Sequence, residues 1–264
     1  MSPIAAAAAD GFEAPSVSDF WQPIFGNEGA FAITRPAVVF IGSALILSAV
    51  LLYATRRMTV VPTRGQFVTE SVYGLVRNSV ARDVIGSREF LKYVPFLFSL
   101  FVLILVNNLF GILPFIQYPT ASRVAIPVAL TLFVFVLYHW IGIRKMGFVG
   151  YFKHMVPPGL PPGLREFIFV LELVTYFFTR PVTLALRLFG NMFAGHLLIL
   201  LCVLGGEYLL FHADGGIGLR LAGVATFFGG FVMTVFEILV EFLQAYIFTL
   251  LAALYIAGSL ADEH

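Results

Sequence analysis

Charge and cysteine are both scarce in this chain of 264 residues: 12% of its positions are Asp, Glu, Lys or Arg, and Cys202 is its one cysteine. Soluble domains carry about 25% charged residues, so the shortage excludes an ordinary water-soluble protein. A lone cysteine cannot form an intrachain disulfide and does not suggest a metal cluster. The net charge of +1 says nothing about nucleic acid, but the sequence has no basic patch or Gly-rich phosphate loop, and we expect no nucleic-acid partner. We expect no cofactor and no metal ion.

The chain is instead rich in long apolar segments, and hydrophobic residues make up 59% of it. Since a membrane-spanning helix needs about 20 apolar residues, the pattern predicts an all-α integral membrane protein with five membrane-crossing segments. The segments are approximately Ala37–Ala54, Tyr93–Phe115, Ile126–Ile143, Phe167–Phe211 and Leu219–Leu260. Between the first two, the stretch from Thr63 to Lys92 spaces charges among apolar residues, which predicts an interfacial amphipathic helix.

We expect one polytopic membrane domain over residues 1–264. It comprises an outer N-terminal segment (1–35), three membrane segments with their inner loops (36–165) and a C-terminal pair of helices (166–264). Loop charges orient it, because inner loops carry an excess of Lys and Arg. With the N-terminus outside, the basic residues inside are Arg56, Arg57, Arg64, Arg77, Arg82, Arg88, Lys92, Arg144, Lys145, Lys153 and Arg165. Those outside are Arg35, Arg123 and Arg220. The bias predicts an outer N-terminus and a cytoplasmic C-terminus.

The start of the chain lacks the basic residues and the long apolar region of a secretory signal. No organellar presequence is evident either. We therefore expect the plasma membrane of a bacterium rather than a mitochondrial inner membrane.

The last two apolar segments are unusually long. Each has about 40 residues, so an unbroken helix would measure about 60 Å, whereas the hydrocarbon layer is about 30 Å thick. Such a helix must tilt by about 60°, or it must break, and the glycine pairs Gly205-Gly206 and Gly229-Gly230 are the candidate positions. Two steeply tilted helices joined by the short loop near His212–Gly218 would form a hairpin with a wide slanted face for a neighbour.

Arg187 is the most informative residue, because its guanidinium keeps its charge in the middle of the fourth segment. That placement costs on the order of 3 kcal/mol, so Arg187 is a candidate functional residue. Thr183 and Asn191 lie one turn before and after it on the same stripe, and the small residues Gly190 and Gly195 let another helix or subunit come close. The alternative interpretation is that Arg187 pairs with a buried carboxylate for architecture alone.

The fifth segment carries a second polar stripe, formed by Glu237, Glu241 and Gln244 at helical spacing. Carboxylates in hydrocarbon are costly unless they are hydrated, paired or protonated, and a group that exchanges protons is what a proton relay needs. The alternative is a hydrogen-bonded seam between two helices. His196 follows Arg187 by nine residues and therefore points to the opposite side of its helix; it is either a packing residue or a partner of these carboxylates.

Other polar residues in the apolar segments also have two possible roles. Glu172 is either an acidic residue on a hydrated inner vestibule or a helix N-terminal charge favoured by the dipole. Asn107 and Asn108 are expected to form hydrogen bonds across helices. We expect His139 at the membrane interface, and Arg180 has either a structural or a functional role.

Three runs carry a resemblance to a known family. They are LRLFGNM (186–192) with Ala194-Gly195-His196, FEILVEFLQAYIFTLLAALYI (236–256) and NNLFGILP (107–114). Together they resemble subunit a of the F-type ATP synthase, and the likeness covers nearly the whole chain. The resemblance implies that Arg187 faces a rotating ring of subunit c, and that two offset half-channels lead protons to and from the carboxylates of the ring.

The resemblance also implies roles for the remaining polar residues. His196 and Glu237 hold positions where some members have Glu and His instead, so the pair is implied in the outer half-channel. Asn191 and Gln244 match positions beside the arginine or along that route, and Glu172 resembles a glutamate of the inner helix. Glu241 departs from the usual apolar residue, and its role stays open.

The expected function is therefore that of a proton-conducting stator subunit, which couples proton flow to ring rotation and ATP synthesis but carries no catalytic site for ATP. Its expected partners are the subunit c ring, the peripheral-stalk subunit b, the rest of the F-type ATP synthase and membrane lipid. The alternatives are a secondary transporter that binds an anionic substrate at Arg187, although the sequence shows no internal repeat, and a structural subunit of a respiratory complex.

Overall fold

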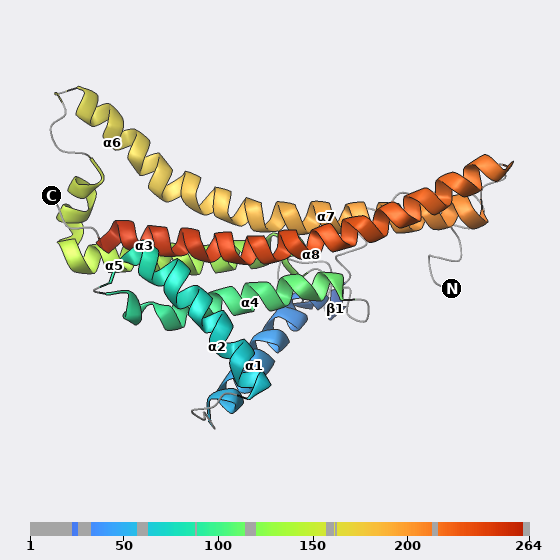
Figure 1. The fold of residues 1–264 in the computed structure, drawn as a ribbon. Helices are drawn as coiled ribbons and strands as arrows, with labels where there is room; N and C mark the ends of the chain where they lie inside the picture. The colour runs from blue at the N-terminus through green and yellow to red at the C-terminus, as the bar shows by residue number, and fades with distance from the viewer. Residues whose placement is uncertain are drawn as a thin grey trace.

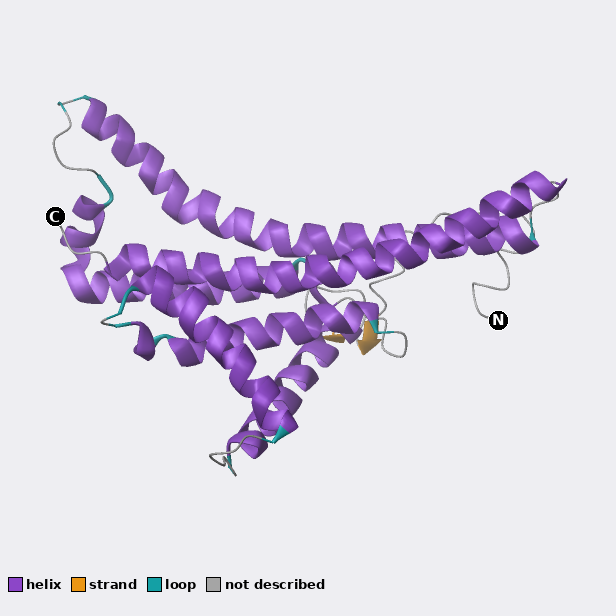
Figure 2. Cartoon of the chain, viewed as in Figure 1, coloured by secondary structure: helices purple, strands orange, loops and turns teal. Residues whose placement is uncertain are grey.

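Helices dominate the computed structural model, which describes residues 23–25, 33–56, 63–87, 89–113, 120–156, 161, 163–212 and 216–260 (Figure 1, Figure 2). The α-helices are α1 (Arg35–Thr55), α2 (Arg64–Leu75), α3 (Asp83–Ile85), α4 (Val94–Ile112), α5 (Ala125–His154), α6 (Leu164–Val174), α7 (Arg180–Phe211) and α8 (Gly216–Leu260). The π-helices are η4 (Val76–Arg82) and η7 (Thr175–Thr179), and the 3-10 turns are η5 (Phe90–Lys92) and η6 (Thr120–Ser122). Strands β1 (Pro23–Phe25) and β2 (Ile33–Thr34) pair antiparallel.

The prediction of a helical membrane protein is confirmed in its coarse form. Among the described residues, four helices are long and apolar enough to cross a membrane: α4, α5, the continuous helix from Leu164 to Phe211, and α8. A shorter apolar helix covers Ala37–Tyr53 within α1. The small β1–β2 pair was not expected. Most of the N-terminal segment and of the loop His154–Pro162 lies outside the described residues.

The two long C-terminal segments are unbroken at both glycine pairs. α7 runs through Gly205-Gly206 and α8 through Gly229-Gly230, and the two helices lie side by side in Figure 1. One glycine of each pair is needed for close packing instead: a Cβ on Gly206 would lie 3.0 Å from the backbone nitrogen of Phe227. Of the two alternatives, the structure therefore has the long helix without a break.

The prediction of one interfacial helix over Thr63–Lys92 is wrong in two respects. The helix ends before Lys92, and its second half is buried in the protein. The helical path from α2 through η4 to α3 ends at Gly86, whose φ of 91° takes the chain out of the helix. Val76, Val80 and Ala81 are fully buried, because η4 packs against α4 and α8. The segment therefore leaves α2 exposed but docks its second half into the core.

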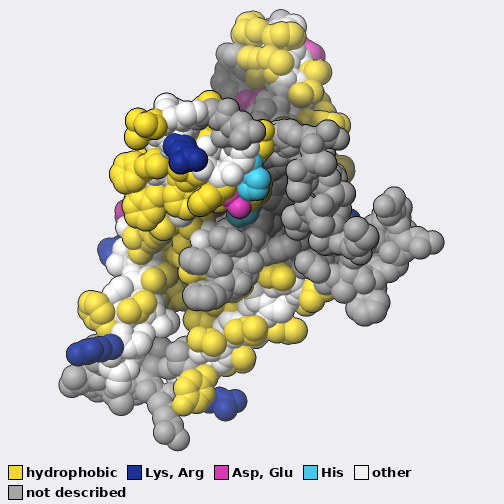
Figure 3. All heavy atoms as spheres, turned by 90° about the vertical axis from the view of Figure 1, so that its right-hand side faces the viewer, with side chains coloured by type: hydrophobic (Ala, Val, Ile, Leu, Met, Phe, Trp, Pro, Cys, Tyr) yellow, Lys and Arg dark blue, Asp and Glu magenta, His cyan; other side chains and the backbone are white. Residues whose placement is uncertain are grey.

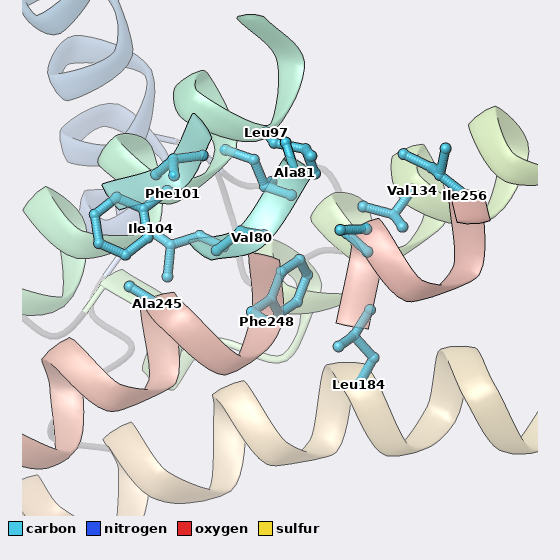
Figure 4. Close-up of a cluster of buried hydrophobic side chains, with 14 of the residues drawn as sticks. Val80, Ala81, Leu97, Phe101, Ile104, Val134, Leu184, Ala245, Phe248 and Ile256 are labelled. Atoms are coloured by element: carbon cyan, nitrogen blue, oxygen red, sulfur yellow. The ribbon is translucent and has the colours of Figure 1, made fainter. Parts of the chain in front are cut away.

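The buried core lies where η4, α4, α5 and α7 converge on the C-terminal half of α8. Figure 4 shows this cluster, whose labelled side chains are Val80, Ala81, Leu97, Phe101, Ile104, Val134, Leu184, Ala245, Phe248 and Ile256. Near the turn between α7 and α8, by contrast, the surface is largely hydrophobic with isolated charged side chains (Figure 3). Such a surface suits lipid or protein neighbours rather than water.

Asn107 and Asn108 form the interhelical hydrogen bonds that the sequence predicts. The Ser43 hydroxyl of α1 lies 3.0 Å from the Asn107 Oδ1 atom, and the Thr120 hydroxyl of η6 lies 3.3 Å from the same atom. The Asn108 side chain donates to the backbone oxygen of Glu241 in α8 at 3.2 Å. These two neighbours therefore tie α4 to three other elements.

α5 continues well past Ile143, where the apolar segment was expected to end. At Gly147 the backbone leaves helical geometry, with φ of 74° and ψ of 164°. Beyond this point Tyr151 packs back on the helix, and its ring fills the space that a Cβ on Gly142 would need. The turn at Gly147 thus places a second layer of aromatic side chains beside the C-terminal half of α5.

Candidate functional site

Arg187 projects from the side of α7 that faces away from the core. The buried residues of this stretch are Leu184, Ala185, Leu188 and Met192, whereas Thr183 and Arg187 are exposed and Asn191 is half-buried. Within the described ranges, the one ion pair joins Lys92 to Glu89, so no described carboxylate lies within 4.0 Å of the Arg187 guanidinium. Thr183 and Arg187 of the predicted stripe are therefore exposed, and no described carboxylate supports the alternative of an architectural ion pair for Arg187.

Arg180 occupies a different environment on the same helix. Its guanidinium carbon lies 3.5 Å from the centroid of the Tyr176 ring and 5.1 Å from that of Tyr255 in α8. Contacts of this kind stabilise a cation by about 0.5 to 2 kcal/mol. Arg180 is thus enclosed by aromatic faces within this chain, while Arg187 stays uncovered.

Glu237 reaches across from α8 to α7. Its carboxylate lies against the α carbon of Gly195, where a Cβ atom would collide with it, and its exposed fraction is only 5%. The next residue on α7, His196, is half-buried. The absence of a side chain at Gly195 therefore brings the acid of α8 to the level of the imidazole on α7.

Glu241 and Gln244 continue the stripe towards the core. Glu241 is 1% exposed and Gln244 is 6% exposed, and Glu241 follows Glu237 by one helical turn on the same buried face of α8. The second carboxyl oxygen of Glu241, Oε2, is buried without a hydrogen-bond partner in the described structure. Two buried carboxylates one turn apart are costly when both are ionised, so this pair can hold a proton.

Glu172 is not brought to this group. It is half-buried in α6, fifteen residues before Arg187 and on the other side of η7, which corresponds to about 22 Å of helix. The structure therefore places Asn191 and His196 on α7 and Glu237, Glu241 and Gln244 on α8, which packs against it, whereas Glu172 lies apart in α6.

The side chain of His139 is buried inside the protein, with 8% exposure, and its position at the membrane interface stays a prediction. Its Nδ1 atom lies 2.9 Å from the backbone oxygen of Phe135, and its ring is 4.1 Å from the Phe135 ring and 4.7 Å from that of Phe177, centroid to centroid. The turn at Gly147, which periodicity does not reveal, adds the Tyr151 ring to the same cluster.

Two further polar residues were not predicted from the sequence. Glu207 is an exposed carboxylate within the apolar stretch of α7, and its charge in that stretch was a sufficient signal to find it. Tyr138, which is 1% exposed and donates a hydrogen bond to the backbone of Tyr176, gave no comparable signal because tyrosines are common in such segments. No group of three or more potential metal ligands occurs in the part of the chain that the structure describes.

A family described as ATP synthase A chain matches residues 37–257. A protein named ATP synthase subunit a from Nocardioides sp. is 42% identical over 274 residues, covering 100% of this chain and 98% of the relative. Proteins of the same name from Pseudarthrobacter chlorophenolicus and Streptomyces lividans are 40% and 36% identical, each over 96% of this chain, and are covered over 95% and 90% of their lengths. The chain belongs to the ATP synthase A chain family, the subunit a family of F-type ATP synthases.

Proposed function

We propose that this chain is the stator subunit that conducts protons across the membrane and couples their flow to rotation of a ring of subunit c, and thereby to ATP synthesis elsewhere in the complex. The observation that carries the proposal is Arg187, which is exposed on a long apolar helix and has no partner among the described carboxylates. A permanent cation in this position is costly unless a partner supplies negative charge. Carboxylates on a passing ring would supply it.

Arg187 is proposed to pair in turn with each deprotonated carboxylate that the ring brings past. At a separation of about 4 Å and an effective dielectric constant of about 20, the attraction is about 4 kcal/mol. That energy is large enough to keep the carboxylate ionised and small enough for exchange to the next site. The same positive charge would block a direct proton leak between the two half-channels.

The outer half-channel is proposed to run along the α7–α8 hairpin. Its support is the contact between the Glu237 carboxylate and Gly195, next to His196, and the buried stripe that continues from Glu237. A proton that enters here would neutralise a ring carboxylate, which can then rotate into lipid. The proposed route comprises Asn191, His196, Glu237, Glu241 and Gln244.

The inner half-channel is proposed to open near Glu172. Its half-buried position in α6, apart from the outer group, suits a separate exit, where a ring carboxylate would release its proton after nearly a full turn. The membrane potential would supply about 2.3 kcal/mol per proton for each 100 mV. Several such steps would accumulate for each ATP made.

The proposed topology has five crossings, with α1 as the first, in the plasma membrane of a bacterium. The N-terminus would lie outside and the C-terminus inside, because Lys and Arg cluster in the loops assigned to the inner side. The tilted hairpin would present its face to the subunit c ring, and peripheral-stalk subunit b would contact the chain elsewhere. The bacterial source of the named relatives is consistent with this location.

The test replaces Arg187 with Ala in the assembled complex and measures ATP-driven proton pumping in inverted membrane vesicles. We expect coupled transport to be lost while the chain still inserts, and Arg220→Ala, which removes an exposed arginine from the start of α8, should change little. Normal pumping by Arg187→Ala complexes would refute the proposal. Failure of the chain to co-purify with a ring of small, hairpin-forming proteolipid subunits would favour the secondary transporter instead.

Glu237→Gln tests the proposed relay separately. Glutamine keeps the shape of the side chain and loses the ability to carry a proton, so transport should slow. An unchanged rate across about pH 6 to 9, the range in which a relay group is expected to work, would remove Glu237 from the route.

A further inference from the structure

The helix that carries Arg187 changes its hydrogen-bonding register just before it reaches that residue. Residues Thr175–Thr179 form the π-helix η7, and the backbone N–H of Arg180 bonds the backbone oxygen of Thr175, five residues earlier. In this register the next amide, at position 181, would bond the oxygen of Tyr176. Position 181 is proline, which has no N–H to donate, so the carbonyl of Tyr176 is left without its helical partner.

Tyr138 of α5 supplies the missing donor. Its hydroxyl donates to the Tyr176 backbone oxygen at 2.9 Å, and its side chain is 1% exposed, so water cannot easily take its place. A buried carbonyl without a partner is costly. The hydroxyl of Tyr138 therefore compensates for the amide that Pro181 lacks, and it holds η7 open at this point.

Arg180 fixes the same turn from the other side. Its guanidinium lies over the Tyr176 ring and near the Tyr255 ring of α8, at 3.5 Å and 5.1 Å from the centroids. α7 is unbroken from Arg180 to Phe211, and Arg187 follows Arg180 by almost two full turns, on nearly the same side. A rotation of the helix at η7 would therefore turn Arg187 by the same angle.

We propose that Tyr138 is a positioning residue: its hydrogen bond to the Tyr176 carbonyl, together with the contact of Arg180 with Tyr255, sets the rotation of α7 and so directs Arg187 outward. The inference rests on the proposed function, in which Arg187 meets the carboxylates of the ring. It adds a residue on α5 that never touches the ring or the proton.

The chain offers a matched control for the hydroxyl. Tyr151 lies on the same helix, is 2% exposed, and touches the His139 ring as Tyr138 does. Its hydroxyl, however, is buried without a hydrogen-bond partner among the described residues. In assembled complexes, Tyr138→Phe should lower proton pumping per ATP hydrolysed by at least about fivefold, the effect of one unsatisfied buried carbonyl. Tyr151→Phe should leave pumping unchanged, and equal effects of the two changes would overturn the proposal.

Pro181→Ala provides the rescue, because alanine restores an N–H at position 181 that can bond the Tyr176 carbonyl itself. In the Pro181→Ala background, Tyr138→Phe should therefore cause no further loss. A hydroxyl needed only for packing would cost the same in both backgrounds. The same fold-loss with and without Pro181→Ala would thus refute the compensation.

Cross-linking separates a failure of this inference from a failure of the proposed function. With Cys202 replaced by Ala, single cysteines are placed at Thr183, on the stripe of Arg187, and at Leu186, which is about 100° around the helix from Arg187 and about 60° from Thr183. Disulfide formation with a cysteine on the ring should favour Thr183 and shift towards Leu186 in Tyr138→Phe. No cross-link at either position in the parent would refute the proposed function. A clear preference for Thr183 that Tyr138→Phe does not alter would refute only the positioning role.

Discussion

The carboxylate of Glu237 lies directly against the α carbon of Gly195, in the space that any larger residue at position 195 would fill with its Cβ atom. Seven residues closer to the turn on both helices, Gly230 of α8 makes a similar approach to Cys202 of α7, whose Cβ would lie 3.1 Å from a Cβ on Gly230. The contact between α7 and α8 therefore has a seam in which small residues on one helix admit side chains of the other. At one level of this seam the admitted side chain is an acid.

Gly195→Ala should impair proton transport by displacing Glu237. The new methyl group has no space unless the carboxylate moves away from α7, and misplacement by about 1 Å can cost as much as a hundredfold in rate. We expect a loss of about tenfold or more in ATP-driven pumping. Glu237→Asp, which shortens the acid by one methylene, should recover part of the rate in the Gly195→Ala background. A Gly195→Ala complex with normal pumping would show that the contact has no functional weight.

The glycines of α8 should differ sharply in their tolerance of substitution. Gly230→Ala must separate α7 from α8 near Cys202, whereas a Cβ on Gly229 meets nothing within 4 Å in this chain. Overpacking of this kind typically costs about 1 to 3 kcal/mol. The midpoint of thermal unfolding in detergent should therefore fall for Gly230→Ala, and for Gly229→Ala it should stay the same or rise, because alanine favours the helix. A larger fall of the midpoint for Gly229→Ala than for Gly230→Ala would contradict the close packing of α7 on α8 at Gly230.

Proton transport should depend on whether the side chain at position 241 is polar rather than on whether it can be charged. The carboxyl of Glu241 is buried one helical turn from Glu237, and a glutamine keeps a polar group there without carrying a proton. Glu241→Gln should therefore slow transport less than Glu237→Gln does, while Glu241→Leu, which leaves Glu237 without its neighbour, should slow it more than Glu241→Gln. Proton flux through vesicles energised with ATP gives the ranking. If Glu241→Gln were the most damaging of the three changes, Glu241 would be the principal relay.

Local geometry explains why part of the site could be predicted from the sequence. Glu237, Glu241 and Gln244 share a buried face because their spacing matches the turn of an α-helix, whatever surrounds it. Arg187 and Thr183 share an exposed face for the same reason. The long apolar segments likewise predicted the positions of the membrane-capable helices, since length and hydropathy are properties of each segment by itself.

Features that depend on distant partners could not be predicted in this way. The burial of His139 follows from rings that the turn at Gly147 brings back onto α5. A single glycine in an apolar segment is not enough to predict such a turn. The bond from Tyr138 to the Tyr176 carbonyl requires knowledge of the π-register before Pro181. The burial of Val76 likewise depends on the packing of η4 against α4 and against α8, which lies far along the sequence.

Asn107 receives two hydroxyl contacts that should differ in importance. Thr120 is fully buried, and its hydroxyl lies 3.3 Å from the Asn107 side-chain oxygen. The Ser43 hydroxyl lies 3.0 Å from that oxygen but also 2.7 Å from the backbone oxygen of Phe40 in its own helix. A hydroxyl has one proton to donate, so Ser43 keeps an acceptor when Asn107 is replaced, whereas Thr120 loses the acceptor found here.

Asn107→Leu should therefore destabilise the protein by about 1 to 2 kcal/mol, chiefly through the buried hydroxyl of Thr120. Thr120→Val removes that hydroxyl at nearly constant shape, so the Asn107→Leu/Thr120→Val double variant should regain much of the stability. Adding Ser43→Ala to Asn107→Leu should regain none, because the Ser43 hydroxyl was still satisfied. The measurement is the unfolding midpoint of the purified complex in detergent. Equal recovery by Thr120→Val and by Ser43→Ala in the Asn107→Leu background would contradict the prediction, because it would mean that both hydroxyls need Asn107 equally.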